Sequence, residues 1–294
     1  MDQLVEEGIR DFVFVIGYLG EKIRLYVEQA YPEINKTFVL QNERQGSAHA
    51  IWVAKEEIRG SSEIIIVFGD TILDIDLKRV LQEEHSCFAV KKVDDPREFG
   101  VVEYDDDRFV KRAIEKPRIP KSDMALVGLY KIQEVEQFLD AIDHNVQNNI
   151  QTYGEYQLTD VLQRLIEEGV KFTTVPVNSW FDCGKKEILL RTNALLLDKE
   201  GYASSRLPNY DNSIIIHPVS IGKNCDISNS IIGPHVTIGD NVNIQHSIVK
   251  ESIIGDYSTI DEVILTQSVV GSDAAIKGGS QSLNIGDNTE IDFS

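Results

Sequence analysis

From about residue 213 onward, aliphatic residues recur with a six-residue period within successive triplets, and this period constrains the fold more than any other feature of the chain. The repeats form successive triplets: Ile215, Ile221 and Ile227; Ile232, Ile238 and Ile244; Ile248, Ile254 and Ile260; Ile264, Val270 and Ile276; and, less perfectly, Gly279, Ile285 and Ile291. An α-helix repeats every 3.6 residues and a strand every two, so neither explains this spacing. A triangular parallel β-helix does, because each of its three sides is a short strand with one residue pointing inward.

Glycine accompanies this period in a regular way. It follows the middle member of every triplet, at Gly222, Gly239, Gly255, Gly271 and Gly286. We expect it at bends where the backbone torsions are unusual. If each triplet is one turn, residues 213–294 form a solenoid of about five coils in which each coil covers the next. Chance aliphatic spacing in a β-rich domain is the competing explanation, and the repeated agreement disfavours it.

Residues 1–200 follow a different pattern, in which short apolar runs alternate with helix-like segments. FVFVIGY precedes EKIRLYVEQAY, KTFVLQ precedes AHAIWVAKEEI, and EIIIVFGD precedes LKRVLQEEH. Strands that alternate with helices predict an α/β domain whose sheet is mainly parallel and carries helices on both faces. The polar, turn-rich segment 201–212 predicts a linker, which leaves 213–294 for the β-helix.

Composition narrows the classes of partner. The formal net charge of -19 disfavours sequence-independent binding to nucleic acid, which needs clustered lysine and arginine. The three cysteines, Cys87, Cys183 and Cys225, are far apart and lack CxxC spacing, which argues against a structural zinc site or a disulfide framework and favours a reducing cytoplasm. Because the sequence has no long uncharged apolar run, we expect no membrane span.

Two carboxylates occupy positions suited to a hard cation. Asp70 ends the strand-like segment EIIIVFGD, and open α/β sheets bind ligands outside the carboxyl ends of their strands. Asp182, in WFDCG, comes just before a helical stretch. The competing interpretations are a turn or capping role for Asp70 and a helix N-cap for Asp182. Sequence spacing alone does not decide between a cap and a magnesium ligand.

Two further segments indicate contacts with a phosphorylated ligand. In QNERQGSAHAI, Gly46 and the small residues after it open a helix, so the backbone can approach a flat ligand or an anion closely. In EKP, Glu115 can accept from hydroxyl groups while Lys116 contacts phosphate. An ordinary helix N-terminus and a surface ion pair at a strand end are the plainer interpretations of these segments taken singly.

The first 200 residues carry eight motifs in order: GIRDFVFVIGY, QNERQGSAHAI, VFGD, DDPREFGVVEYD, EKPRIPKS, VGLYKI, GEYQLTDVLQRLIEEG and WFDCG. In this register they resemble the nucleotidyltransferases that make nucleoside-diphosphate sugars, such as glucose-1-phosphate thymidylyltransferases and UDP-sugar pyrophosphorylases. The resemblance implies a Rossmann-like nucleotidyltransferase domain at 1–200. A left-handed parallel β-helix at 213–294 fits it as well, because such solenoids follow the catalytic domain in several branches of that family.

The resemblance also implies a role for each matching position. Asp70 and Lys116 would act in catalysis, and Asp70 and Asp182 would hold Mg²⁺, with carboxylates roughly 4 to 8 Å apart. The implied reaction is attack of a sugar-1-phosphate oxygen, by default that of glucose-1-phosphate, on the α-phosphate of dTTP or UTP, with release of pyrophosphate. The resemblance implies that Gln41 and Gly46 contact the nucleotide base and that Glu155 lies near the sugar. The residues that it implies line the sugar-phosphate pocket are Gly100, Glu115, Lys116 and Gly128.

One part of the family pattern has no counterpart in the 294 residues. The family begins with a strand and a GGxGTRL loop that wraps the triphosphate, followed by a PK pair, whereas Met1 aligns with the helix before the second strand. Three explanations stay open: the chain given lacks its N-terminal segment, the protein is a degenerate sugar-nucleotide binder, or another polypeptide supplies the segment. The first is preferred because the retained motifs all look usable. We expect negligible turnover from these residues alone.

Two other functions compete with nucleotidyl transfer. One is a non-catalytic sugar-nucleotide sensor that oligomerises through the solenoid. The other is an acyltransferase carried by the solenoid, with His217, His235 or His246 as the base, although solvated loop positions are the plainer interpretation of these histidines. We therefore expect the solenoid to serve structure or homo-oligomer formation. The expected partners are a nucleoside triphosphate and a sugar-1-phosphate, with no nucleic acid and no membrane.

Overall fold

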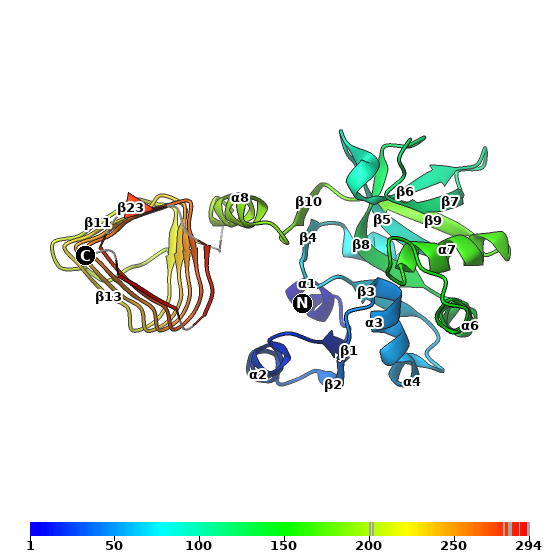
Figure 1. Ribbon diagram of the computed structural model, residues 1–294, viewed down its shortest axis with the longest axis horizontal. Helices are drawn as coiled ribbons and strands as arrows, with labels where there is room; N and C mark the ends of the chain where they lie inside the picture. Colours follow the sequence, from blue (N-terminus) through cyan, green and yellow to red (C-terminus); the bar gives the residue numbers. More distant parts are fainter. Residues whose placement is uncertain (200, 202, 279, 282–283, 288, 293–294) are drawn as a thin grey trace. The chain divides into compact units, whose positions relative to one another are not determined.

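The computed structural model describes all of the 294 residues except 200, 202, 279, 282–283, 288 and 293–294. The chain divides into two compact units, Met1–Trp180 and Phe181–Ser294, which Figure 1 colours from blue to green and from green to red. The six-residue period lies wholly within the second unit. No helix in the described part of the chain is long and apolar enough to cross a membrane.

The first unit contains a six-stranded sheet with the order β7-β6-β8-β5-β9, in which β3 also pairs with β8. Its strands are β3 (Ile64–Val67), β5 (Ser86–Lys92), β6 (Gly100–Tyr104), β7 (Val110–Glu115), β8 (Met124–Ile132) and β9 (Phe172–Pro176). The predicted α/β class is confirmed, but the prediction of a mainly parallel arrangement is wrong for this sheet: β5 and β9 are parallel, whereas β8 runs antiparallel to β3, β5 and β6, and β6 runs antiparallel to β7. No α-helix separates β5, β6, β7 and β8 in the chain, and strands joined without a crossover helix pair antiparallel.

Helices cover both faces of this sheet, as predicted. Alternate residues of β5 point to opposite faces and therefore enter two different cores. Phe88 packs in one core with Phe138 of α6 and Leu162 of α7, whereas Cys87 packs in another core with Val80 of α5. Figure 1 shows α6 and α7 beside the sheet. The helices of the unit are α1 (Asp2–Glu6), α2 (Gly20–Ala30), α3 (Ser47–Val53), α4 (Lys55–Ile58), α5 (Leu77–Gln82), the short η1 (Pro96–Glu98), α6 (Val135–Gln147) and α7 (Leu158–Glu167).

Strands β1 (Asp11–Ile16) and β2 (Asn35–Leu40) form a separate parallel pair. A cavity of about 1030 Å³ opens between β1 and β3 and is lined by residues of both strands, of α3 and of the turn at Asp70. Among the described residues, β1 pairs only with β2 and β3 only with β8. Both strands therefore present an unpaired edge, which is open to pairing with a further strand.

The second unit contains three parallel sheets of five strands each, one for every side of the predicted triangular solenoid. The first sheet holds β11 (Ile214–Ile215), β14 (Ile231–Ile232), β17 (Ile248–Lys250), β20 (Ile264–Thr266) and β23 (Ser280–Gln281). The second holds β12 (Val219–Ile221), β15 (Val236–Ile238), β18 (Ile253–Ile254), β21 (Val269–Val270) and β24 (Asn284–Ile285). The third holds β13 (Asp226–Ser228), β16 (Asn243–Gln245), β19 (Thr259–Asp261), β22 (Ala275–Lys277) and β25 (Glu290–Asp292). The prediction of a left-handed parallel β-helix is confirmed.

Most of the predicted inward residues are buried, including Ile238 and Ile254, and Ile215, Ile221 and Ile285 pack partly buried against the same core, but two others do not point inward. In the first sheet Val249 and Leu265 fill the core, and their neighbours Ile248 and Ile264 lie on the outer face. The prediction for Ile248 and Ile264 is wrong because the step from the third sheet to the first takes five residues, as from Ile244 to Val249. Gly279 lies outside the described residues.

The repeated glycines are needed for a different reason from the one predicted. None of Gly222, Gly239, Gly255 and Gly271 has a positive φ. A Cβ on Gly255 would lie 2.5 Å from the backbone nitrogen of Ser272 in the next coil, and one on Gly222 would lie 2.5 Å from the carbonyl oxygen of Gly239. Stacked coils approach too closely there for a side chain. The left-handed torsions fall instead on other corner residues, such as Asn241, with a φ of 57°.

The boundary between the units falls after Trp180, inside β10 (Ser179–Asp182), and therefore earlier than the predicted linker at 201–212. Strand β10 pairs with β4 (Thr71–Asp74). Helix α8 (Lys186–Leu197) belongs to the same unit as the solenoid, and its residue Asn193 makes hydrogen bonds to solenoid residues. The Thr237 hydroxyl donates to Oδ1 of Asn193 at 2.6 Å, and Nδ2 of Asn193 donates to the carbonyl of His235 at 3.3 Å.

Candidate active site

The candidate site begins where β1 and β2 end. Because these strands are parallel and in register from Asp11 to Ile16, Gly17 and Gln41 follow them at the same edge. A Cβ on Gly17 would lie 3.5 Å from the carbonyl oxygen of Gln41. This carboxyl edge is where α/β sheets bind their ligands.

The Gln41 side chain is held by the N-terminal part of α3. Its Nε2 lies 3.0 Å from Nδ1 of His49 and 3.4 Å from the carbonyl oxygen of Gly46. The buried His49 ring stacks near Trp52 and Tyr156, with centroid distances of 5.5 and 6.2 Å. Burial lowers the pKa of His49, so that the imidazole is neutral near pH 7.

Gly46 lies where two backbone segments meet. Ala48 N donates to the Tyr156 carbonyl at 2.9 Å, and Tyr156 N donates to the Gln45 carbonyl at 2.8 Å. Gly46 has a φ of 108°, and a Cβ there would lie 2.5 Å from the Tyr156 carbonyl oxygen. Only glycine suits this position, and the contact of Gly46 with a nucleotide base stays a prediction.

Gly100 and Glu115 come together at one end of the β6–β7 hairpin, where they are register partners. The Glu115 side chain is only 11% exposed, and its Oε2 accepts from the Thr159 hydroxyl at 2.7 Å. A Cβ on Gly100 would lie 3.1 Å from both Glu115 Oε2 and Thr159 Oγ1. The missing side chain at Gly100 therefore leaves room for a carboxylate fixed by Thr159.

Lys116 brings a cation beside this carboxylate. The Lys116 side chain is half-exposed, and its Nζ lies 3.9 Å from Oε1 of Glu115. The Tyr153 hydroxyl donates to the Lys116 carbonyl at 2.9 Å, and Tyr156 from the same loop contacts the Gly46 segment. The exposed Glu155 lies between these two anchors. The loop before α7 thus joins the Gln41 cluster (Gln41, Gly46 and His49) to the Glu115 cluster (Gly100, Glu115, Lys116 and Thr159).

Asp70 occupies an exposed turn after β3 and lines the cavity between β1 and β3. The turn is fixed to β8, because Phe68 N donates to the Gly128 carbonyl at 2.9 Å. Gly128 has a φ of 81° where the β5–β8 register shifts, and a Cβ there would lie 3.0 Å from the Phe68 ring. Gly128 supports the Asp70 turn, and its contact with a sugar phosphate stays a prediction.

Asp182 ends β10 and lies beyond the unit boundary, so its convergence with Asp70 stays a prediction. Its Oδ1 accepts from Gly184 N at 3.2 Å. The alternative role as a helix N-cap is wrong, because α8 begins at Lys186 and its N-cap residue is Lys185. No group of three or more His, Cys, Asp or Glu side chains suited to a metal gathers in the described part of the chain. Mg²⁺ is commonly bound through one or two carboxylates together with waters and substrate phosphates, so these two aspartates fit its chemistry.

Comparison with known proteins assigns the chain to a family. A profile described as nucleotidyl transferase matches residues 1–199. The chain belongs to the nucleotidyl transferase family. Among its relatives, the bifunctional protein GlmU of Methanocaldococcus jannaschii is 33% identical over 196 residues, which cover 66% of this chain and 45% of GlmU. The glucose-1-phosphate thymidylyltransferase of Streptomyces antibioticus is 28% identical over 232 residues, which cover 76% and 62% of the two chains.

This nucleotidyl transferase family member is also similar to a further relative and to a protein of known structure. The UTP–glucose-1-phosphate uridylyltransferase AglF of Haloferax volcanii is 28% identical over 197 residues, which cover 63% of this chain and 77% of AglF. A crystal structure of a Bacillus anthracis protein assigned as a glucose-1-phosphate thymidylyltransferase matches with a TM-score of 0.55 at 24% identity, over 67% of this chain and 80% of that one. It shows the shared fold. The chain spans about half the length of GlmU.

The sequence did not single out three residues that hold the candidate site residues in place. They are Thr159, His49 and Tyr153. Thr159 lies in the motif GEYQLTD, but 44 positions separate it from Glu115, and no sequence pattern pairs the two. His49 lies in QGSAHAI on the buried face of α3. A buried polar residue within a short amphipathic helix is the only signal that points to His49 or Thr159.

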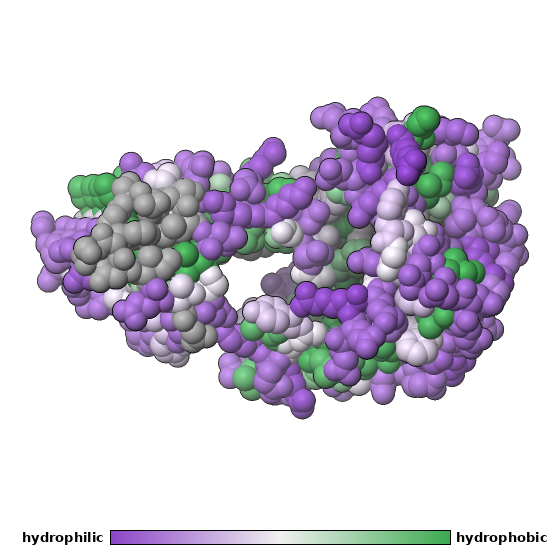
Figure 2. Space-filling model, in the orientation of Figure 1, coloured by the Kyte–Doolittle hydropathy of each residue, from purple (hydrophilic) through white to green (hydrophobic). Residues whose placement is uncertain are grey.

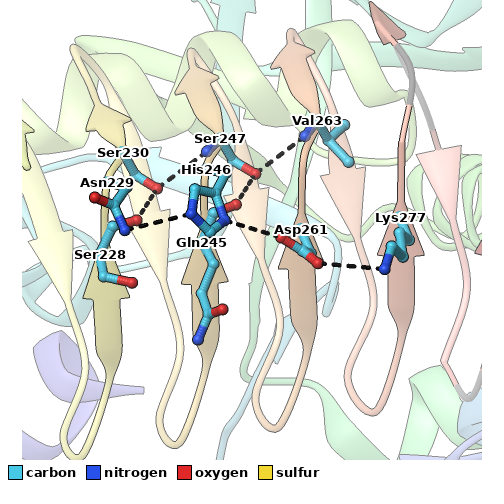
Figure 3. A network of polar contacts seen from close by, with 9 residues as sticks. All are labelled: Ser228, Asn229, Ser230, Gln245, His246, Ser247, Asp261, Val263 and Lys277. Atoms are coloured by element: carbon cyan, nitrogen blue, oxygen red, sulfur yellow. Dashed lines mark hydrogen bonds and ion pairs between the residues drawn. The ribbon is translucent and has the colours of Figure 1, made fainter.

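Two of the three solenoid histidines, His235 and His246, take part in structural contacts. Figure 3 shows His246 in a polar network at a corner of the solenoid, with Nδ1 3.4 Å from Asp261 Oδ1 and Nε2 3.4 Å from Asn229 Nδ2. Asn212 in turn donates to Asn229 at 2.9 Å, so His246 continues an asparagine ladder. These contacts favour the structural interpretation. The other two are His217, which is exposed, and His235, whose Nε2 lies 3.2 Å from Asp198 Oδ1.

Proposed function

We propose that the protein forms a nucleoside-diphosphate sugar from glucose-1-phosphate and dTTP or UTP, with release of pyrophosphate. Membership of the nucleotidyl transferase family supports the reaction class. The names of the Streptomyces antibioticus and Haloferax volcanii relatives support the substrates. The observation that carries the proposal is the Glu115 carboxylate, nearly buried, fixed by Thr159 and flanked by the Lys116 ammonium.

In the proposed reaction these residues bind and orient the acceptor. Thr159 occupies Oε2 of Glu115, which leaves Oε1 to accept from a sugar hydroxyl. The half-exposed Lys116 ammonium attracts the sugar phosphate and holds its attacking oxygen in place. Asp70 and Asp182 would hold Mg²⁺, which would neutralise charge on the triphosphate and on the departing pyrophosphate.

We also propose that these 294 residues alone turn over negligibly. They include no GGxGTRL loop to donate backbone N–H groups to the triphosphate. The cavity between β1 and β3, with an unpaired edge on either side, supports the proposal that a further strand belongs there. Gly100 and Glu115 lie on other strands, β6 and β7, so weak binding of the product is expected to persist.

A homo-oligomer remains part of the proposal. The outer face of the first solenoid sheet carries Ile214, Ile231, Ile248 and Ile264 in register. Ile214 and Ile264 are 59% and 45% exposed, and Figure 2 shows hydrophobic surface over the part of the solenoid that Figure 1 labels β11. Such an apolar ladder suits contact with another copy, and sedimentation velocity measures it.

Product binding tests the function at Glu115. Isothermal titration calorimetry with UDP-glucose and dTDP-glucose should detect binding of at least one by the 294-residue chain. Glu115→Gln should weaken that binding by about tenfold, because hydrogen bonds to a charged group are the stronger ones. Glu103→Gln is the matched control, since Glu103 on neighbouring β6 pairs only loosely with Arg112, at 3.9 Å. Absence of binding to both sugars, or equal affinity of Glu115→Gln and the control, would contradict the proposal.

A further inference from the structure

The contacts of Gln41 fix which end of its amide faces the candidate site. Gly46 contributes a carbonyl oxygen, which can only accept, and it lies 3.4 Å from the amide nitrogen of Gln41. The reversed amide would set two oxygens against each other. The same nitrogen lies 3.0 Å from Nδ1 of His49. Since the Gln41 nitrogen is the donor, Nδ1 must be the acceptor, and the proton of the neutral ring lies on Nε2.

The surroundings of His49 preserve this arrangement. The side chain is 8% exposed, and the ring lies between Trp52 and Tyr156, with interplanar angles of 28° and 23°. Burial lowers its pKa, which keeps Nδ1 free of a proton. If the His49 ring were protonated at Nδ1, its N–H would face the N–H of the Gln41 amide, and two donors would oppose each other. Stacking and burial thus hold an acceptor against Gln41.

We propose that His49 is a positioning residue for base selection: by accepting from the Gln41 amide nitrogen, it turns Oε1 of Gln41 toward the base and so favours uracil or thymine over cytosine. The inference rests on the proposed function, in which Gln41 contacts the base. Uracil and thymine carry an N–H at N3, which can donate to Oε1. Cytosine carries a lone pair at N3, so the two acceptors would face each other. A buried polar group left unpaired in this way costs about 10- to 100-fold in affinity.

Two variants separate positioning from packing. His49→Phe keeps an aromatic ring between Trp52 and Tyr156 but removes the acceptor. His49→Asn restores a carbonyl oxygen that can accept from Gln41. The probes are UMP and CMP, which differ only in the protonation of N3 and the group on C4. Calorimetry should give a 10- to 100-fold preference for UMP with the unaltered chain, a loss of about tenfold in that preference with His49→Phe, and its recovery with His49→Asn.

The outcomes distinguish the two claims. If the unaltered chain binds neither UMP, dTMP nor a nucleotide sugar, the proposed function fails. If it prefers UMP and His49→Phe keeps that preference, the function stands and the role of His49 is wrong. A preference for CMP would overturn the orientation of the Gln41 amide.

A measurement on the unaltered chain remains decisive if His49→Phe does not fold. Nitrogen-15 spectra of the imidazole side chains report the protonation of each ring nitrogen. Nδ1 of His49 should be unprotonated at neutral pH, and Nε2 should carry the proton. A proton on Nδ1 would make the ring a donor to Gln41 and would overturn the inference without any binding measurement.

Discussion

Gly46 is the most constrained residue of the candidate site. Its φ of 108° strains any other residue, and a Cβ would overlap the Tyr156 carbonyl at 2.5 Å. Gly46→Ala should therefore lower the free energy of unfolding of the first unit by more than about 2 kcal/mol, because strain and overlap act together. Urea unfolding followed by tryptophan fluorescence measures the effect.

Gly60 provides the matched control for this change. It has a φ of 79°, but a Cβ there meets nothing within 4 Å. Gly60→Ala should cost about 1 kcal/mol from backbone strain alone. If Gly46→Ala were no more destabilising than Gly60→Ala, the close packing of the 155–156 segment against the start of α3 would be wrong, and with it the link between the Gln41 and Glu115 clusters.

At the scale of the element, the solenoid strands are joined by a buried serine ladder, which Figure 3 shows in part. Ser230 Oγ accepts from Ser247 N, and Ser247 Oγ accepts from Val263 N, each at 3.1 Å. Ser247 also donates to the Gln245 carbonyl at 2.6 Å. Because Ser247 is 1% exposed, water cannot replace these bonds.

Ser247→Ala should therefore leave the Val263 amide without its acceptor, and lower the local stability of the solenoid by about 1 to 3 kcal/mol. Hydrogen exchange at Val263 N–H reports this change directly, because local opening becomes easier. Ser228→Ala, in neighbouring β13, alters a half-buried hydroxyl outside the ladder and serves as the control. Equal exchange in both variants would mean that the ladder contributes nothing measurable.

At the scale of the whole molecule, the sequence predicts most of the architecture because periodicity is a local signal. Two details escape it for physical reasons. The inward residues Val249 and Leu265 each follow an isoleucine, so the pattern of apolar residues cannot tell which neighbour faces the core. Antiparallel pairing of β8 depends on connections rather than on strand composition.

The candidate site divides in the same way. Gln41, Glu115 and Lys116 are found by the order of motifs, and the structure places Glu115 beside Lys116 and Gln41 beside Gly46. The residues that fix them, Thr159 and His49, are not found. Thr159 lies 44 positions from Glu115, and although His49 lies only eight positions from Gln41, no sequence pattern shows which side chains are bonded to each other. Prediction from sequence therefore finds the residues that are proposed to contact a ligand more readily than the residues that position them.

The cavity between β1 and β3 connects the fold to the proposed activity. Its two strand edges and its volume of about 1030 Å³ suit one more strand. A chain extended at the N-terminus by about 40 residues, the size of one strand-loop-helix unit, should fill it and supply the triphosphate loop. Such a chain should also unfold at a higher temperature and aggregate less, because the exposed edges become paired.

Pyrophosphate release tests the central claim most directly. The 294-residue chain and the extended chain are compared with Mg²⁺, glucose-1-phosphate and either dTTP or UTP. The extended chain should release pyrophosphate with at least one nucleotide, and the 294-residue chain should be slower by about 100-fold or more, since removing even one donor to the transition state has an effect of that size. Comparable turnover by the shorter chain would contradict the need for the loop, and no turnover by the extended chain would contradict the proposed reaction.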